Sequence, residues 1–144
     1  MAAKNFGRTW LGRLLRGRRG PAPLDPARAD LVVVVSGYDD AEAASAALAR
    51  GTGWRPAEQA VLRHHLVLPT AAVEAVLSIV AQDGYAADGP SRPRGDGTVE
   101  LGVQRVQVLD ALHCSQERSR MAGLAARHDG TVLGWDARQP GGAD

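Results

Sequence analysis

Two stretches of the chain show the same order of hydrophobic and polar patterns. Residues 64–86 give a short apolar strand, a helix with one apolar face, a glycine and a second extended segment. Residues 106–135 repeat that order, and residues 98–103 alternate as a half-buried strand does. Residues 64–137 together therefore predict a β-α-β-β-α-β arrangement, in which an antiparallel sheet has two helices on one face.

The two helices predicted within this motif each have one apolar face. In the first helix, apolar side chains recur at helical spacing at Val73, Val76, Leu77 and Val80. The second helix runs from about Ala111 or Ser115 to His128, and its apolar face consists of Met121, Leu124 and Ala125. We expect the two faces to cover the same side of a single sheet.

The strand before the second helix changes phase along its length. Residues 99–103 alternate between apolar and polar side chains, whereas Val106 and Val108 are shifted by one position. A β-bulge inserts one extra residue and would restore the phase. We therefore predict a bulge near Gln104 and Arg105.

An additional strand and helix precede this motif. The aliphatic run Leu31–Val35 predicts a strand buried on both faces. Residues 41–50 are rich in alanine and predict a helix with a small apolar face, while residues 58–63 are expected to be a short helix or a loop. The predicted fold class is α+β, a ferredoxin-like antiparallel sheet with helices on one face, plus an extra N-terminal strand–helix unit.

Composition divides the 144 residues into four parts. Residues 1–20 carry six basic and no acidic residues, and residues 21–29 form a proline-rich linker. Residues 30–137 are predicted to form a single α+β domain with its core motif at 58–137. Residues 138–144 are expected to be a disordered tail.

The first 20 residues combine basic charge with an apolar helical face. On a helical wheel, the aromatic residues fall with the leucines on one half, and most of the arginines fall on the other. Such a segment can bind an anionic membrane surface, a groove on a protein partner or RNA phosphates. It can also be a disordered tail, because its glycines weaken an isolated helix. The candidate binding residues are Phe6, Arg8, Trp10, Arg13, Arg16, Arg18 and Arg19.

The residues capable of chemistry do not form a recognisable active site. His64 and His65 are adjacent on a predicted strand, so they point to opposite faces and cannot share a metal ion. We expect one to enter the core with a hydrogen-bond partner and the other to face solvent. Neighbouring helical residues such as His113 and Cys114 diverge by about 100°, so Cys114 is expected to be a small buried residue. We predict no catalytic residue, no cofactor, no metal and no enzymatic activity.

The core motif resembles the family of regulators of ribonuclease E activity B (RraB-like). The matching segments are LRHHLVLP at 62–69, QDGYAA at 82–87 and MAGLAARHDGTVLGW at 121–135. Gly134 and Trp135 match the GWG ending of that family, and Asp136 stands where a glycine is usual. The resemblance covers residues 58–137. It implies a ferredoxin-like fold and a protein that binds and inhibits the endoribonuclease, without chemistry of its own.

Three functions remain as alternatives at this stage. The first is a non-catalytic regulatory protein that acts by protein–protein binding, with ribonuclease E and RNA turnover as the context that the resemblance implies. The second is a peripheral accessory subunit, docked on a membrane or a larger complex through residues 4–19. The third is a small-ligand sensor of the ACT type. A single cysteine and the lack of a long apolar run lead us to expect a cytoplasmic location, with peripheral contact at the inner face of the membrane in the second case.

Overall fold

The computed structural model describes residues 22–141 of the chain. Over these residues it is a mixed α/β domain with a six-stranded antiparallel sheet and three α-helices. The strands are β1 (Leu31–Gly37), β2 (Gln59–Pro69), β3 (Ala86–Ala87), β4 (Arg92–Pro93), β5 (Thr98–Val108) and β6 (Thr131–Pro140). The helices are α2 (Ala44–Ala49), α3 (Val73–Ala81) and α4 (Ala111–Arg127), and a 3-10 turn at Thr70–Ala72 precedes α3.

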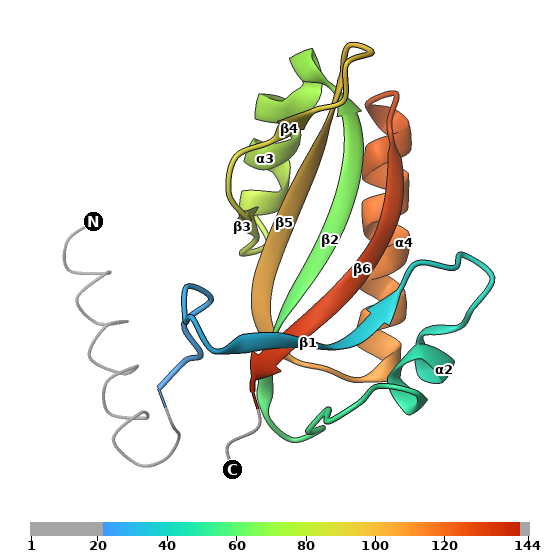
Figure 1. The fold of residues 1–144 in the computed structure, drawn as a ribbon. Coiled ribbons are helices and arrows are strands. Elements are labelled where there is room, and N and C mark those ends of the chain that lie inside the picture. Colours follow the sequence, from blue (N-terminus) through green and yellow to red (C-terminus); the bar gives the residue numbers. More distant parts are fainter. Residues whose placement is uncertain (1–21, 142–144) are drawn as a thin grey trace, which may run out of the picture.

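The strands lie in the order β1-β6-β2-β5-β3, and the short β4 also pairs with β5 (Figure 1). The central strand β2 pairs with β5 without interruption, from Gln59 opposite Val108 to Pro69 opposite Thr98. Its other neighbour, β6, pairs with it through a register shift between His65 and Leu66. Both helices of the predicted motif, α3 and α4, lie behind the sheet in Figure 1.

One apolar cluster joins α3 and α4 to the sheet, as predicted. Val76 and Val80 of α3 share it with Met121, Leu124 and Ala125 of α4. The strands contribute Leu66, Leu68, Leu101 and Val103. Burying a side chain of this size stabilises the fold by about 1.5–3 kcal/mol, so this packing fixes both helices on one side of the sheet.

A second apolar cluster lies at the other end of the helix-covered face. It contains α2 residues Ala47 and Leu48, together with Val35, Cys114 and Trp135. The small side chains of α2 let this short helix lie close to the start of α4 (Figure 1). Trp135 is 2% exposed, so it belongs to the core.

The predicted bulge in β5 is wrong, because the β2–β5 register is continuous. The helix-facing positions after Val103 are instead polar, since Arg105 and Gln107 occupy them and hydrogen-bond to each other. Val106 and Val108 therefore point to the opposite face of the sheet. The irregularities lie in β1, near Val33 and Val35, and in β6 opposite His65.

Three further expectations need correction. β1 is an edge strand that pairs only with β6, so Val32 and Val33 are 48% and 51% exposed rather than buried. The segment expected as a short helix or loop at residues 58–63 lies almost wholly in β2, which begins at Gln59. β6 continues to Pro140, so the predicted tail begins too early at residue 138.

Candidate functional site

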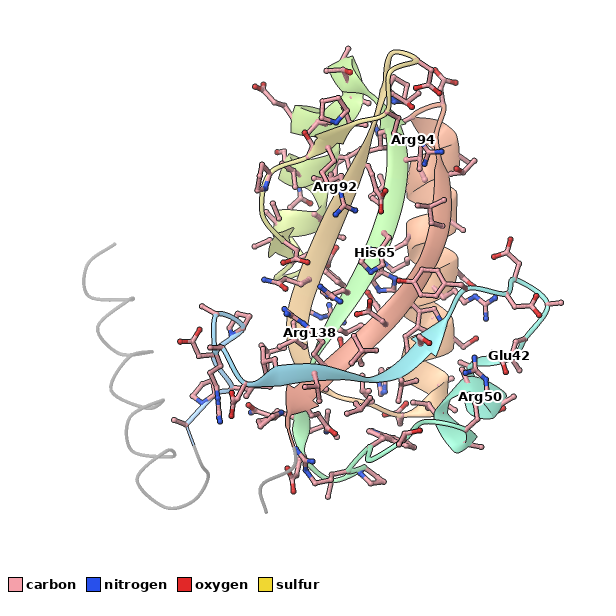
Figure 2. All side chains as sticks on the ribbon, in the orientation of Figure 1. Glu42, Arg50, His65, Arg92, Arg94 and Arg138 are labelled. Carbon is pink, nitrogen blue, oxygen red and sulfur yellow. The ribbon has the colours of Figure 1, made fainter. Side chains whose placement is uncertain are left out.

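His64 and His65 lie at the middle of the sheet and point to its two opposite faces, as predicted. His64 is opposite Val103 and Trp135, and it is 1% exposed beneath the helices. His65 lies on the face turned away from the helices (Figure 2). The two histidines therefore mark two separate polar clusters, one on each side of β2.

The cluster on the side without helices is centred on Asp136. We call it the open-face cluster; its members are Tyr38, Arg63, His65, Asp88 and Asp136. Arg63 donates two hydrogen bonds to the Asp136 carboxylate, at 2.7 and 2.9 Å, and His65 Nε2 lies 2.9 Å from the same group. Tyr38 donates a longer bond of 3.3 Å, and Arg63 also reaches Asp88 at 3.0 Å. A bidentate arginine–carboxylate pair of this kind fixes both side chains.

His65 is less exposed than predicted. Its side chain is 13% exposed, because the Tyr38 ring stacks over it with ring centroids 5.9 Å apart. Tyr38 can lie so close to the sheet because a glycine stands beneath it: a Cβ on Gly134 would overlap the Tyr38 ring. Gly134 is also the direct β6 partner of His65. The glycine of the Gly134-Trp135 pair thus makes room for this stack.

The electrostatics of the open-face cluster keep Asp136 ionised. Burial raises the pKa of the Asp136 carboxyl, but the hydrogen bonds from His65 and Arg63 outweigh it, so the pKa lies below its ordinary value. Burial, and then the nearby Asp136 charge, raise the pKa of Tyr38. At neutral pH the cluster therefore pairs the positive Arg63 guanidinium with the negative Asp136 and Asp88 carboxylates.

The cluster on the helix side is centred on Tyr85. We call it the helix-side network; its members are His64, Tyr85, Arg105 and Glu117. The Tyr85 hydroxyl donates a bond of 2.8 Å to Glu117 and lies 3.4 Å from His64 Nε2. The Arg105 guanidinium lies over the Tyr85 ring, 4.5 Å from its centroid. Burial and the bond to Glu117 raise the pKa of Tyr85.

The other chemically capable residues have structural roles. Asp110 caps α4 by accepting a hydrogen bond from the His113 amide at 2.7 Å, and its other oxygen contacts His113 Nδ1 at 2.6 Å. Cys114 is buried, as predicted, and burial followed by the Asp110 charge raises the pKa of its thiol to about 11. A thiol in that state is a poor nucleophile at neutral pH.

The predicted binding residues between Phe6 and Arg19 lie outside the described residues. Within residues 22–141, no three His, Cys, Asp or Glu side chains lie close enough to hold a metal ion. None of the helices in that part of the chain is long and apolar enough to cross a membrane.

The sequence patterns predicted neither of the two polar clusters. Arg63 and Asp136 are 73 positions apart, and Tyr85 and Glu117 are 32 apart, so only the fold brings them together. The available signals were the paired histidines and the aspartate at position 136. Comparisons of the chain with protein-family models, with curated proteins and with solved structures found no match.

Proposed function

We propose that the protein is a non-catalytic regulator that acts by binding another protein through the sheet face opposite α3 and α4. The observation that supports this most directly is the open-face cluster, whose paired charges and His65 stack hold the half-exposed Tyr38 ring on a face that no helix of residues 22–141 covers (Figure 2). Such preorganised groups lose little side-chain entropy when a partner binds.

The surroundings of the open-face cluster have the composition of a protein interface. Arg92 pairs with Glu100 at 2.7 Å, and the Arg92 side chain is 70% exposed. Tyr38 is 54% exposed and Val33 is 51% exposed. Tyrosine and arginine are enriched at the centres of protein interfaces, so this face offers both an aromatic anchor and cations.

Two groups that could perform chemistry, the Asp136 carboxylate and the Cys114 thiol, are already engaged or buried in the fold. The Asp136 carboxylate is held by Arg63, His65 and Tyr38, and Cys114 is buried with a raised thiol pKa. A general base needs a free lone pair at the reacting atom. This engagement favours a binding role over an enzymatic one.

The family context is part of the same proposal. The order β6-β2-β5-β3 of the four motif strands, with α3 and α4 on one face, supports a ferredoxin-like assignment and a relation to the RraB-like family. On that basis the partner is ribonuclease E or a larger RNA-processing assembly, the effect is modulation of RNA turnover, and the location is cytoplasmic. Fold alone does not fix function, so the partner must be tested directly.

The test uses the full chain as bait in its native host, with mass spectrometry of the co-purified proteins. We expect an RNA-processing protein to be enriched, and the purified pair to bind in solution. Val33→Asp on the open face should weaken that binding, whereas Leu112→Asp, at a 63% exposed position on α4, should leave it unchanged. A bait that enriches no RNA-processing protein, or equal binding by both variants, would reject the proposal.

A second candidate function rests on the basic N-terminal segment. We propose as the alternative that residues 4–19 dock the protein as a peripheral accessory subunit on an anionic membrane surface or a larger complex. The supporting observation is the charge of six basic and no acidic residues in positions 1–20, with Phe6 and Trp10 on the apolar half of the helical wheel.

Vesicle binding separates this alternative from the first proposal. The full chain should bind anionic vesicles, and a variant lacking residues 1–20 should not. Binding should weaken as salt increases, because screening reduces the attraction of exposed charges. Equal binding by both forms would reject the membrane role without affecting the proposal for the open face.

A further inference from the structure

A groove lies at the end of the sheet where β2 begins and where β5 and β6 end. Its volume is about 730 Å³. The strands contribute Gln59, Val108 and Pro140 to its lining, and the segment before β1 contributes residues between Ala22 and Arg28. Figure 1 shows that segment in blue beside the start of β1. The groove is therefore lined in part by the first residues that the structure describes.

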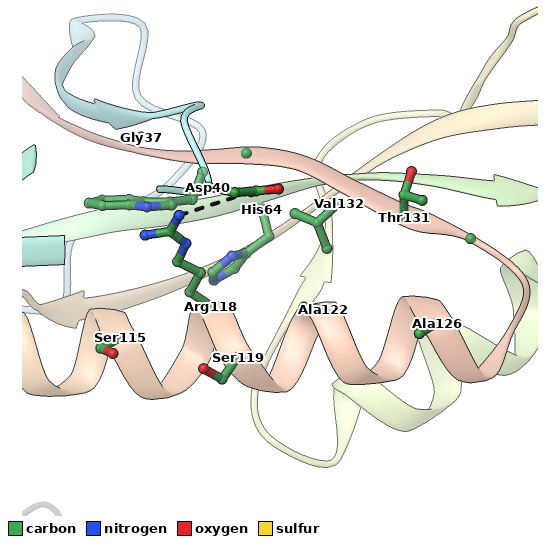
Figure 3. A pocket seen from close by; sticks show the side chains of 13 residues that line it. Gly37, Asp40, His64, Ser115, Arg118, Ser119, Ala122, Ala126, Thr131 and Val132 are labelled. Carbon is green, nitrogen blue, oxygen red and sulfur yellow. Dashed lines mark ion pairs between the residues drawn. The ribbon is translucent and has the colours of Figure 1, made fainter. Parts of the chain in front are cut away.

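A different pocket lies between α4 and β6, where α4 presents small side chains such as Ser115 and Ala122 (Figure 3). Arg118 lies in its wall, 4.0 Å from the Asp40 carboxylate, and it donates a hydrogen bond to the backbone oxygen of Glu42. These contacts hold the segment after β1 against α4, but they identify no occupant. The groove differs because it adjoins a chain segment that can fill it.

The lining of the groove is mainly apolar. Val108 is 47% exposed, and Pro23, Leu24 and Pro140 line the groove with it. The Leu24 amide donates a hydrogen bond to the Gln59 side chain, which fixes the segment before β1 against β2. Contiguous exposed apolar groups mark a binding surface, so we expect this one to be covered when the protein is folded.

The position of Ala22 identifies a segment that can cover this surface. Ala22 lines the groove, and residues 4–19, which we call the N-terminal segment, precede it in the chain. The apolar half of the helical wheel of this segment consists of Phe6, Trp10, Leu11, Leu14 and Leu15. An extended chain spans at most about 3.6 Å per residue, so the few residues between Leu15 and Ala22 allow this half to reach the groove. Covalent attachment gives an effective concentration in the millimolar range, so even a weak contact is populated.

The charges at the rim suit a basic segment. The Asp25 carboxylate accepts a hydrogen bond from the Ala27 amide at 2.9 Å, and it forms no ion pair within residues 22–141. The other charged side chains of the rim, Arg28 and Glu58, are each paired with a neighbour of opposite charge. Residues 1–20 carry six basic and no acidic residues, and all 16 acidic residues lie after them. The rim thus offers one unpaired carboxylate to a segment that is rich in arginine.

We propose that the N-terminal segment folds back and docks in this groove, with its apolar half against Val108 and Leu24 and an arginine near Asp25. Docking covers the same apolar side chains that would enter a membrane, so the protein masks its own membrane-binding surface. The groove is separate from the open-face cluster, and the docking does not depend on the function proposed there.

Spin-label NMR of the full chain tests where the N-terminal segment lies. A nitroxide is attached at Thr9→Cys, on the polar half of the helical wheel, in a Cys114→Ala background that leaves one cysteine to label. The amide signals of Leu24, Gln59 and Val108 should be broadened, whereas those of α3, on the other side of the sheet, should not.

A mixed sample separates docking within one chain from docking between two chains. Spin-labelled chains without ¹⁵N are mixed with ¹⁵N-labelled chains that carry no nitroxide. We expect no broadening in this mixture. Equal broadening of the groove signals there would place the segment of a second copy in the groove and would overturn the proposal.

Variants with matched controls locate the docking site. Val108→Lys replaces an apolar contact by a charge that repels arginine, so the broadening at Leu24 and Gln59 should be lost. Ile79→Lys makes the same change in charge at a 36% exposed position on α3 and should keep the broadening. Trp10→Ser, within the segment, is the second variant should Val108→Lys fail to fold, and it should also abolish the broadening.

A second pair of variants tests the charge at the rim. Asp25→Asn retains the shape of the side chain and should reduce the broadening. Asp39→Asn is the control, because its carboxylate accepts an equivalent bond from the Ala41 amide at 2.9 Å, away from the groove. Equal broadening in these two variants would overturn the pairing with Asp25. No broadening in the full chain, or unaltered broadening in folded Val108→Lys or in Trp10→Ser, would overturn the docking itself.

Discussion

His64 and His65 are consecutive residues of one strand, yet the fold gives them opposite chemistry. His64 is 1% exposed under α4, and among residues 22–141 its ring has one hydrogen-bond partner, the Tyr85 hydroxyl at 3.4 Å from Nε2. His65 lies under the Tyr38 ring and contacts the Asp136 carboxylate at 2.9 Å. The difference arises from strand geometry alone, since successive side chains of a strand point to opposite faces.

The comparison shows that the two faces stabilise their buried polar groups in different ways. On the open face, Asp136 is 3% exposed and stays ionised because Arg63 and His65 supply charge-assisted hydrogen bonds. On the helix side, no carboxylate of residues 22–141 is hydrogen-bonded to His64, and burial leaves its ring neutral with one nitrogen unpaired. The charged groups of the open face therefore have hydrogen-bond partners, whereas the helix side holds a neutral histidine with one unpaired ring nitrogen.

The largest expected effect comes from removing the centre of the open-face cluster. Asp136→Ala leaves Arg63, whose side chain is 17% exposed, without its main partner, and a broken buried ion pair costs about 3–5 kcal/mol. Urea denaturation at neutral pH should show a loss of that size in the free energy of unfolding. Asp30→Ala, which breaks the exposed pair with Arg28, is the control and should leave the urea midpoint unchanged.

The neutral state of His64 predicts a second, pH-dependent effect. The folded pKa lies below the unfolded one, so the unfolded chain binds the extra proton as pH falls from about 6.5 toward the folded value of about 3. The stability associated with neutral His64 is complete above pH 6.5 and decreases below it, by up to about 1.4 kcal/mol per pH unit. Denaturation of wild type and His64→Phe between about pH 6.5 and 5 should show a shallower slope for the variant. Equal slopes would mean that buried His64 becomes protonated.

A third comparison removes one hydroxyl from each face. Tyr85→Phe leaves Glu117 without its 2.8 Å bond and His64 Nε2 without an acceptor, so we expect a loss of about 1.5 kcal/mol in the free energy of unfolding. Tyr38→Phe removes a longer bond of 3.3 Å at a half-exposed residue and should cost about 0.5 kcal/mol. The reverse ranking would show that the open face depends more on its tyrosine than its geometry suggests.

The pattern of the sequence predicted the helix-covered core because that core depends on short-range periodicity. The buried positions of α3 and α4 recur at helical spacing, and the alternation at residues 99–103 marks one face of β5. The opposite orientation of the two histidines follows from the same rule. These features need no knowledge of which strands become neighbours.

The rest of the fold depends on contacts between distant residues. The run Leu31–Val35 resembles a central strand, but β1 lies at the edge of the sheet, and Val32 and Val33 are about half exposed. A bulge was expected near Gln104 and Arg105, yet β5 stays in register with β2, and Arg105 lies over the ring of Tyr85, from the segment after α3. The Asp136 cluster draws on β2, β6 and the segments after β1 and β3, so no local pattern could reveal it.

The last prediction concerns His65 itself, and it measures how much of the stability of the open-face cluster depends on Arg63. His65→Phe retains the aromatic stack with Tyr38 and leaves both Arg63 hydrogen bonds to Asp136 in place. The loss should be about 1 kcal/mol at neutral pH, the net value of one hydrogen bond to a charged group that keeps other partners. Urea denaturation of His65→Phe beside Asp136→Ala gives the ratio directly. A loss as large as that of Asp136→Ala would make His65 the principal partner of the buried carboxylate, and it would remove the distinction between a satisfied ion-pair face and a neutral helix-covered face.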